Sequence, residues 1–246
     1  MIEILQWSTL ATCAVVAGAR VPSALRGENR TVFYIFALLT VAILLSIEAP
    51  YVAIDKALGG INLTNLILRF VIFAAIYFVG IRVTKGFDAE DGHRLITGWA
   101  GRAVLALISM AVVVLFLMMD TAGSSSGLNR VALKDARNGL LVELYGAAGR
   151  AYPTFVSLVL LPAMVRAVRS ALPALVRMAA FLLGAGAVAI ALTLLFPLWP
   201  PQWGTAKFIV NYTAVLCFVI GLALIWAARI RYGRNVPRKI TYTTAE

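Results

Sequence analysis

Histidine is nearly absent from this sequence, since His93 is the only one among 246 residues. A haem held by two histidines is therefore excluded by count, and no cysteine or second histidine lies near His93 to complete a zinc site. The two cysteines, Cys13 and Cys217, each lie inside an apolar run, where a single thiol usually serves as a small packing residue. A His-Glu-x-x-His motif and a Walker loop are also missing. We therefore predict no catalytic residues, no metal site and no cofactor.

Charge is also scarce, and it is unbalanced. Only 13% of the residues are charged, 61% are hydrophobic, and Lys and Arg outnumber Asp and Glu by 22 to 11. A soluble domain carries about twice that charged fraction, so the excess of apolar surface indicates a lipid environment. The net charge of +11 is divided into short clusters between apolar runs. This pattern fits the topology signals of a membrane protein and not a nucleic-acid interface.

Long apolar runs divide the chain into seven segments, each near the length of about 20 residues that a helix needs to cross a bilayer. The sequence therefore predicts an all-α integral membrane protein, with one bundle of about seven transmembrane helices over residues 1–231 and a short basic tail over 232–246. We expect the sixth segment, which contains Gly184–Ala187, to pack closely on its neighbours because small residues let helices approach. The predicted spans are Ile2–Gly18, Val32–Val52, Leu63–Ile81, Trp99–Met119, Ala147–Val168, Pro173–Trp199 and Ala206–Ala228.

The first apolar segment could be mistaken for a signal peptide because of its position. It lacks a basic amino-terminal region, however, and it carries Glu3. The nearest positive charges, Arg20, Arg26 and Arg30, follow the apolar run instead of preceding it. We therefore expect this segment to be retained as the first span.

Basic residues gather in alternate connections, which predicts an orientation. Four clusters lie on the same side of the membrane if seven segments cross it, and basic connections are normally cytoplasmic. The sequence thus predicts an outside N-terminus and a cytoplasmic C-terminus in the plasma membrane of a bacterial cell. The clusters are Arg20, Arg26 and Arg30; Arg82, Lys85, Arg94 and Arg102; Arg166, Arg169 and Arg177; and Arg229, Arg231, Arg234, Arg238 and Lys239.

Two connections on the predicted outer side have a distinctive composition. Residues 122–129, which include Gly123–Gly127, are rich in Gly and Ser and predict a flexible linker. Residues 131–144 follow it and predict a short amphipathic helix on the outer surface. The Pro- and Trp-rich residues 197–203 are typical of an aromatic anchor at the membrane interface, and a lid over an external site is the alternative.

Ionisable residues inside apolar segments are costly in lipid and indicate functional sites. Arg69 lies about two turns inside the third segment, and Asn65 precedes it by one turn on the same helix face. Glu48 lies at a similar depth in the second segment and shares a face with Tyr51. These depths predict an outer-facing polar vestibule in which Glu48 and Arg69 form an ion pair. The predicted ligand-binding residues are Glu48, Tyr51, Asn65, Arg69, Lys207 and Asn211.

The same residues also have a purely structural interpretation. Arg69 can extend its guanidinium toward the interface without binding any ligand, and Glu48 can simply end the second segment before Pro50. Asn65 and Asn211 can form hydrogen bonds that join helices. Both interpretations stay open on the sequence alone.

Residues 48–55, Glu-Ala-Pro-Tyr-Val-Ala-Ile-Asp, and residues 58–66, Leu-Gly-Gly-Ile-Asn-Leu-Thr-Asn-Leu, cover the end of the second predicted span, the connection after it and the start of the third. They resemble the corresponding region of an actinobacterial family of multi-span membrane proteins of unknown function that are described as transporters. The resemblance covers the first third of the chain, and members of that family often carry a longer cytoplasmic tail. It implies a similar multi-span fold and a transport role.

We therefore expect a multi-pass protein, embedded in the lipid bilayer, that binds or transports a small polar or amphiphilic ligand as a transporter or receptor. The alternative is a structural or assembly subunit that docks on a partner membrane protein or on further copies of itself. A lipid-modifying enzyme is a third class, but no nucleophile with a matching base and no metal cluster supports it.

Overall fold

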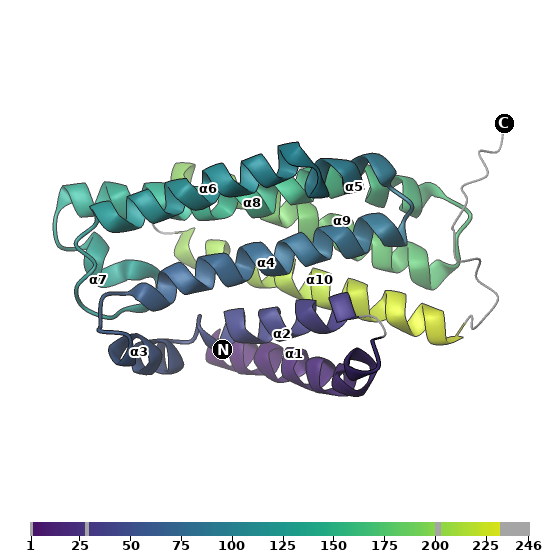
Figure 1. The fold of residues 1–246 in the computed structure, drawn as a ribbon, viewed down its shortest axis with the longest axis horizontal. Helices are drawn as coiled ribbons and strands as arrows, with labels where there is room; N and C mark the ends of the chain where they lie inside the picture. Colours follow the sequence, from purple (N-terminus) through teal and green to yellow (C-terminus); the bar gives the residue numbers. More distant parts are fainter. Residues whose placement is uncertain (1, 28–29, 200–202, 232–246) are drawn as a thin grey trace. The chain divides into compact units, whose positions relative to one another are not determined.

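The computed structural model describes residues 2–27, 30–199 and 203–231. Within these ranges every regular element is a helix (Figure 1). Among the described residues, six helices are long and apolar enough to cross a membrane, and the number rises to seven if one bent pair of shorter helices counts as a span. The protein is therefore all-α and membrane-embedded, which confirms the predicted class.

Six of the seven predicted spans correspond to a long helix. Their ends differ from the predicted ones mainly because basic residues near a helix end can reach the membrane interface while the backbone stays helical. Thus α1 continues past Arg20 and α4 continues past Arg82. The long helices are α1 (Ile2–Leu25), α4 (Leu63–Gly86), α6 (Trp99–Met118), α8 (Ala136–Arg169), α9 (Ala174–Leu192) and α10 (Gly204–Arg231).

The second predicted span is broken into α2 (Arg30–Leu44) and α3 (Glu48–Ala57), which meet at an angle of 89°. Pro50 favours a break at this point, because inside a continuous helix its ring would clash with the carbonyl one turn earlier, although α8 contains two prolines and stays one helix. A new helix that begins at Glu48 avoids this, since Pro50 then lies in the first turn, where the missing N–H is not needed. Ile47 links the two helices in an extended conformation.

The predicted short amphipathic helix over residues 131–144 is wrong. The structure instead has a 3₁₀ turn, η1 (Ser126–Leu128), then one turn of helix, α7 (Asn129–Ala132), and then α8. Residues 136–144 are the first turns of α8, which is 34 residues long and so extends for about 51 Å. That length exceeds the hydrocarbon core of about 30 Å, so α8 also carries residues beyond it.

Packing divides the chain into two compact units, the first of which holds residues 1–79 and 103–152. In this unit α1 packs on α2, and aromatic rings join the other helices. Phe73 of α4 lies 5.5 Å from Tyr152 of α8, and Phe116 of α6 lies 6.2 Å from Tyr145 of α8, between ring centroids. Ring pairs of this kind contribute about 1 kcal/mol each beyond the area they bury.

The second unit holds residues 80–102 and 153–246. It includes α5 (Glu90–Thr97), the packed pair α9 and α10, and the 3₁₀ segment η2 (Thr193–Leu198). A side-chain carbon added at Gly186 of α9 would lie 3.0 Å from Phe218, and one at Gly221 of α10 would lie 2.8 Å from Leu183. The predicted close packing of the sixth segment is therefore confirmed.

Candidate functional site

Asp55, near the end of α3, is fully buried and organises the turn into α4. Its carboxylate accepts hydrogen bonds from the main-chain N–H of Asn62 at 2.9 Å and of Thr64 at 3.1 Å. It also accepts one from the hydroxyl of Ser124 at 2.6 Å. The turn between the helices contains Gly59 and Gly60, both with positive φ, a conformation that glycine adopts without strain. The carboxylate thus joins α3, α4 and the connection after α6.

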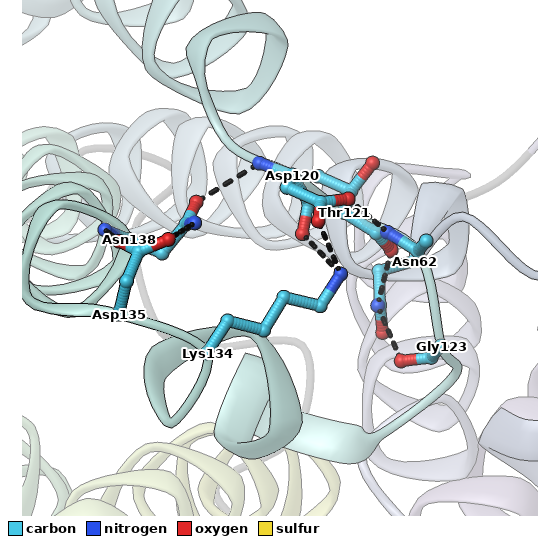
Figure 2. Close-up of polar contacts among 8 residues, drawn as sticks. Asn62, Asp120, Thr121, Gly123, Lys134, Asp135 and Asn138 are labelled. Atoms are coloured by element: carbon cyan, nitrogen blue, oxygen red, sulfur yellow. Dashed lines mark hydrogen bonds and ion pairs between the residues drawn. The ribbon is translucent and has the colours of Figure 1, made fainter.

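Asn62 is the second buried member of this network and is fully buried itself. Its side-chain Nδ2 donates to the carbonyls of Thr121 at 2.8 Å and Gly123 at 2.9 Å (Figure 2). Its Oδ1 accepts from the hydroxyl of Tyr51 at 2.8 Å and from the N–H of Ser125 at 3.0 Å. Both donors and both acceptor positions of the amide are therefore used, which fixes the connection against the start of α4.

A second polar group holds the other end of the same connection. Asp120 accepts a hydrogen bond in a 2.8 Å ion pair with Lys134, and its own N–H donates to Asn138 at 2.9 Å (Figure 2). The carboxylate of Asp135 caps α8 by accepting from the N–H of Asn138 at 2.7 Å. Hydrogen bonding to Lys134 lowers the pKa of Asp120, and hydrogen bonding to Asn138 lowers the pKa of Asp135.

The prediction of a flexible linker over residues 122–129 is wrong. Ser124 and Ser125 are buried and bonded to Asp55 and Asn62, as described above. The Ser126 hydroxyl and N–H both donate to the carboxylate of Glu48, on the first turn of α3. Composition indicated flexibility, but polar partners from α3 and α4, far away in the sequence, hold the segment in place.

Residues Gly123–Gly127 also contain the letters of the Gly-x-Ser-x-Gly pattern of hydrolases. That pattern acts as a nucleophile elbow only between a strand and a helix, whereas here it lies between α6 and η1. The central hydroxyl, of Ser125, accepts a hydrogen bond from the N–H of Arg130 at 3.1 Å. The segment therefore has the role of a connection, and its geometry gives no support for a nucleophile.

Further along α4 from Asn62, Asn65 and Arg69 form a polar cluster with Tyr145 of α8. Asn65 and Tyr145 are almost fully buried and Arg69 is half-buried. The guanidinium carbon of Arg69 lies 5.2 Å from the centre of the Tyr145 ring, within the range of a cation–π contact. Three buried polar atoms, Asn65 Oδ1, Arg69 Nε and Tyr145 Oη, have no hydrogen-bond partner among the described residues. Buried polar groups are normally satisfied, so this cluster has unused binding capacity.

The structure distributes the predicted site residues differently from the sequence analysis. The predicted ion pair is not formed, since within the described residues Glu48 bonds to Ser126 and Arg69 contacts Tyr145. Tyr51 is fully buried and supports Asn62, as described above. Lys207 (half-buried) and Asn211 (exposed) lie on α10 and belong to the second unit. Of the predicted set, the first unit holds Glu48, Tyr51, Asn65 and Arg69, and Asn65 and Arg69 belong to the cluster with Tyr145.

The contribution of Tyr145 was missed, because an isolated tyrosine in a helical segment carries no motif. One signal was present in the sequence: Gly146 and Gly149 follow Tyr145 on α8, and small residues in a span mark places where something approaches closely. A side-chain carbon at Gly149 would lie 2.8 Å from the Cζ and Nε atoms of Arg69. The glycine thus lets the guanidinium lie against the backbone of α8.

A separate shallow hollow of about 380 Å³ surrounds His93 in the second unit. Thr84 and the Nδ1 atom of His93 share a hydrogen bond of 3.2 Å. Glu90 and Arg94 form an ion pair of 3.8 Å between two exposed side chains, a geometry that contributes little. Over the described residues, no group of three His, Cys, Asp or Glu side chains could hold a metal ion. The hollow is thus a weaker candidate than the Arg69 cluster.

No family model, curated protein or solved structure matches the chain.

Proposed function

We propose that this protein binds a small polar or amphiphilic ligand at the cluster of Asn65, Arg69 and Tyr145, and acts as a membrane transporter or receptor. The likeness of residues 48–66 to the actinobacterial family described as transporters agrees with this role. Tyr51 and Asn62 support the site by holding the connection after α6 against the start of α4. Glu48, Lys207 and Asn211 are not needed for the proposed site.

The observation that carries the proposal is the state of Arg69. Arg69 is the seventh residue of α4 and lies about 9 Å along the helix from its start. A charge inside a span is costly and is normally retained for a function. In the described part of the chain no carboxylate pairs with it, and its Nε is buried without a partner. A ligand that accepts hydrogen bonds would remove that cost.

We also propose seven spans, with α2 and α3 together as the second, an outside N-terminus and a cytoplasmic C-terminus in a bacterial plasma membrane. The clusters of basic residues in alternate connections support this orientation. Arg229 to Lys239, which form the fourth cluster, lie at or beyond the end of the described side chains. In this orientation the connection 119–135 and α3 face outward, and the Arg69 cluster is reached from the outside.

A thermal-shift screen of the purified protein against metabolites, ions and a native lipid extract tests the proposal. A ligand that binds the native state raises its stability, by about 2.7 kcal/mol at a concentration 100 times the Kd. We expect a ligand that stabilises the wild type and Arg102→Leu but not a folded Arg69→Leu. Arg102 is a matched control because it is an exposed arginine whose Nε donates to the carbonyl of Gly98, one turn earlier on the chain.

If no compound stabilises the wild type, the ligand-binding proposal fails and the assembly-subunit alternative takes its place. The structure gives that alternative less support than the sequence did. Its motivation was the small-residue stretch of α9, and Gly186 packs on Phe218 of α10 within the same unit. Recovery of a stoichiometric partner from mild detergent would favour it.

A further inference from the structure

We infer that the group recognised on the ligand is an oxyanion, a phosphate or carboxylate, held by Arg69 next to Arg150 where α4 meets the glycines of α8. The inference rests on the proposed function and narrows it to a chemical class. Four observations on the first compact unit carry it.

The first observation is the close contact of the Arg69 side chain with α8. A side-chain carbon at Gly149 would lie 2.8 Å from the Cδ, Cζ and Nε atoms of Arg69, a distance that no side chain tolerates. The ring of Tyr145, one turn earlier on α8, lies 5.2 Å from the guanidinium carbon. Contacts from two positions on one helix thus fix the guanidinium, which lowers the entropy lost when it binds a ligand.

The second observation is a second guanidinium nearby. Arg150 follows Gly149, and its side chain folds back along α8 so that a carbon at Gly146 would lie 3.3 Å from its Nη1. The positive charges of Arg69 and Arg150 act on each other. Two like charges held in one part of a span are unfavourable by themselves, and an anion that contacts them offsets both the repulsion and the burial.

The third observation is that the acids of the first unit near Arg69 are used elsewhere. Asp55 accepts three hydrogen bonds from Asn62, Thr64 and Ser124. Glu48 accepts two hydrogen bonds from Ser126. Glu143 is exposed and acts on Arg150. Among the described residues, no carboxylate is therefore left to form an ion pair with Arg69.

The fourth observation is the type of neutral groups beside Arg69. Tyr145 Oη lies beside the Arg69 guanidinium, which can only donate to it. The Tyr145 hydroxyl hydrogen has no acceptor among the described residues, so it can be donated to an anion. A guanidinium donates in a planar fork that matches two oxygens of a carboxylate or phosphate. A fork with a neighbouring hydroxyl donor favours an oxyanion over a cation or an apolar group, and the unpaired acceptor, Asn65 Oδ1, fits a ligand that also carries an N–H or O–H donor.

An oxyanion can come from a free solute or from the headgroup of an anionic lipid, and the test separates these sources. The full chain is placed in nanodiscs of phosphatidylcholine, and inorganic phosphate or acetate is titrated at constant ionic strength. A second set of nanodiscs contains phosphatidylglycerol and no added anion. Thermal unfolding is measured for the wild type, Arg69→Gln, Arg150→Gln and the control Arg102→Gln.

We expect phosphate, acetate or phosphatidylglycerol to stabilise the wild type and Arg102→Gln saturably. Arg69→Gln is expected to lower the affinity about 10- to 100-fold, the range for a lost hydrogen bond to a charged group, and Arg150→Gln to lower it less. A response to phosphate or acetate identifies a free anion, and a response to phosphatidylglycerol alone identifies a lipid headgroup. Equal responses of wild type and Arg69→Gln, or no response to any of these anions, would overturn the inference.

Two further variants keep the test valid if Arg69→Gln does not fold. Arg69→Lys keeps the charge and loses the planar fork, and Gly149→Ala displaces the guanidinium without removing it. Both are expected to weaken anion binding, whereas Gly18→Ala, whose added carbon meets nothing within 4 Å, is expected to leave it unchanged. Unchanged binding in both Arg69→Lys and Gly149→Ala would also contradict the inference.

Failure of the oxyanion inference is distinguishable from failure of the proposed function. A neutral ligand could stabilise the wild type and lose its effect in Asn65→Leu while the anions have none. In that case the site binds a ligand and only the oxyanion class is wrong. If neither neutral nor anionic compounds act, both the class and the site are wrong.

Discussion

Asp55 shows how one buried side chain can fix a whole connection of a membrane protein. It accepts hydrogen bonds from two main-chain N–H groups at the start of α4 and from the hydroxyl of Ser124. These donors are buried with it, so water cannot replace the carboxylate as their acceptor if it is removed. The position of the Arg69 cluster on α4 depends on these hydrogen bonds to Asp55.

At the same scale, Asp55→Ala is expected to lower the free energy of unfolding by about 3 kcal/mol, because it leaves buried donors without an acceptor. Thermal or SDS-induced unfolding of the purified protein measures the change. Asp91→Ala is the control, since Asp91 is an exposed aspartate of α5 in the second unit and should unfold nearly like the wild type. Similar stability of the two variants would show that the network around Asp55 is not needed.

At the scale of the element, the connection from α6 to α8 is held by acids in their charged form. Asp120 pairs with Lys134, and Asp135 caps the first turn of α8. Both side chains have a pKa lowered below the ordinary aspartate value, by the hydrogen bond from Lys134 in one case and from Asn138 in the other. Negative charge at the first turn of a helix is also favoured by the helix dipole.

A native pKa below the unfolded one gives stability that is present above the unfolded pKa and is lost as the pH falls through the native pKa. We therefore expect the wild type to lose stability below about pH 4, and Asp120→Asn to lose less over the same interval. Unfolding temperatures of both proteins between about pH 2.5 and 6 measure the difference. Parallel pH profiles for the two proteins would argue against a role for the Asp120 charge.

At the scale of the whole molecule, the orientation that we propose from the basic clusters can be measured. The connection before α8 and the residues after it lie at opposite ends of this one helix. They must therefore face opposite sides of the membrane if α8 crosses it, as its length allows. Ala122 and Ala171 are exposed positions in these two connections.

We expect a membrane-impermeant maleimide to label Ala122→Cys in intact cells, and Ala171→Cys only after the membrane is made permeable. Both are made in a background with Cys13→Ala and Cys217→Ala, which removes the two native thiols. Labelling in the reverse order would place the N-terminus in the cytoplasm. Labelling of both positions in intact cells would mean that α8 does not cross.

The class of fold was predictable because membrane helices obey a local rule. Every main-chain N–H and C=O in lipid must be bonded within its own segment, so a long apolar run specifies a helix without reference to the rest of the chain. The predictions for α4, α6 and α10 therefore agree with the structure to within a few residues at most ends. The close packing of the sixth segment follows from small residues, which is also a local property.

The sequence by itself thus determined the helical, membrane-embedded class and singled out Asn65 and Arg69. Only the tertiary structure decided the partners: Glu48 binds Ser126, 78 positions away, and not Arg69. Depth along a helix states how far a side chain lies from the membrane surface, but not which neighbour it faces. That choice depends on how helices and connections pack, and packing here brought Tyr145 and Gly149 of α8 to Arg69.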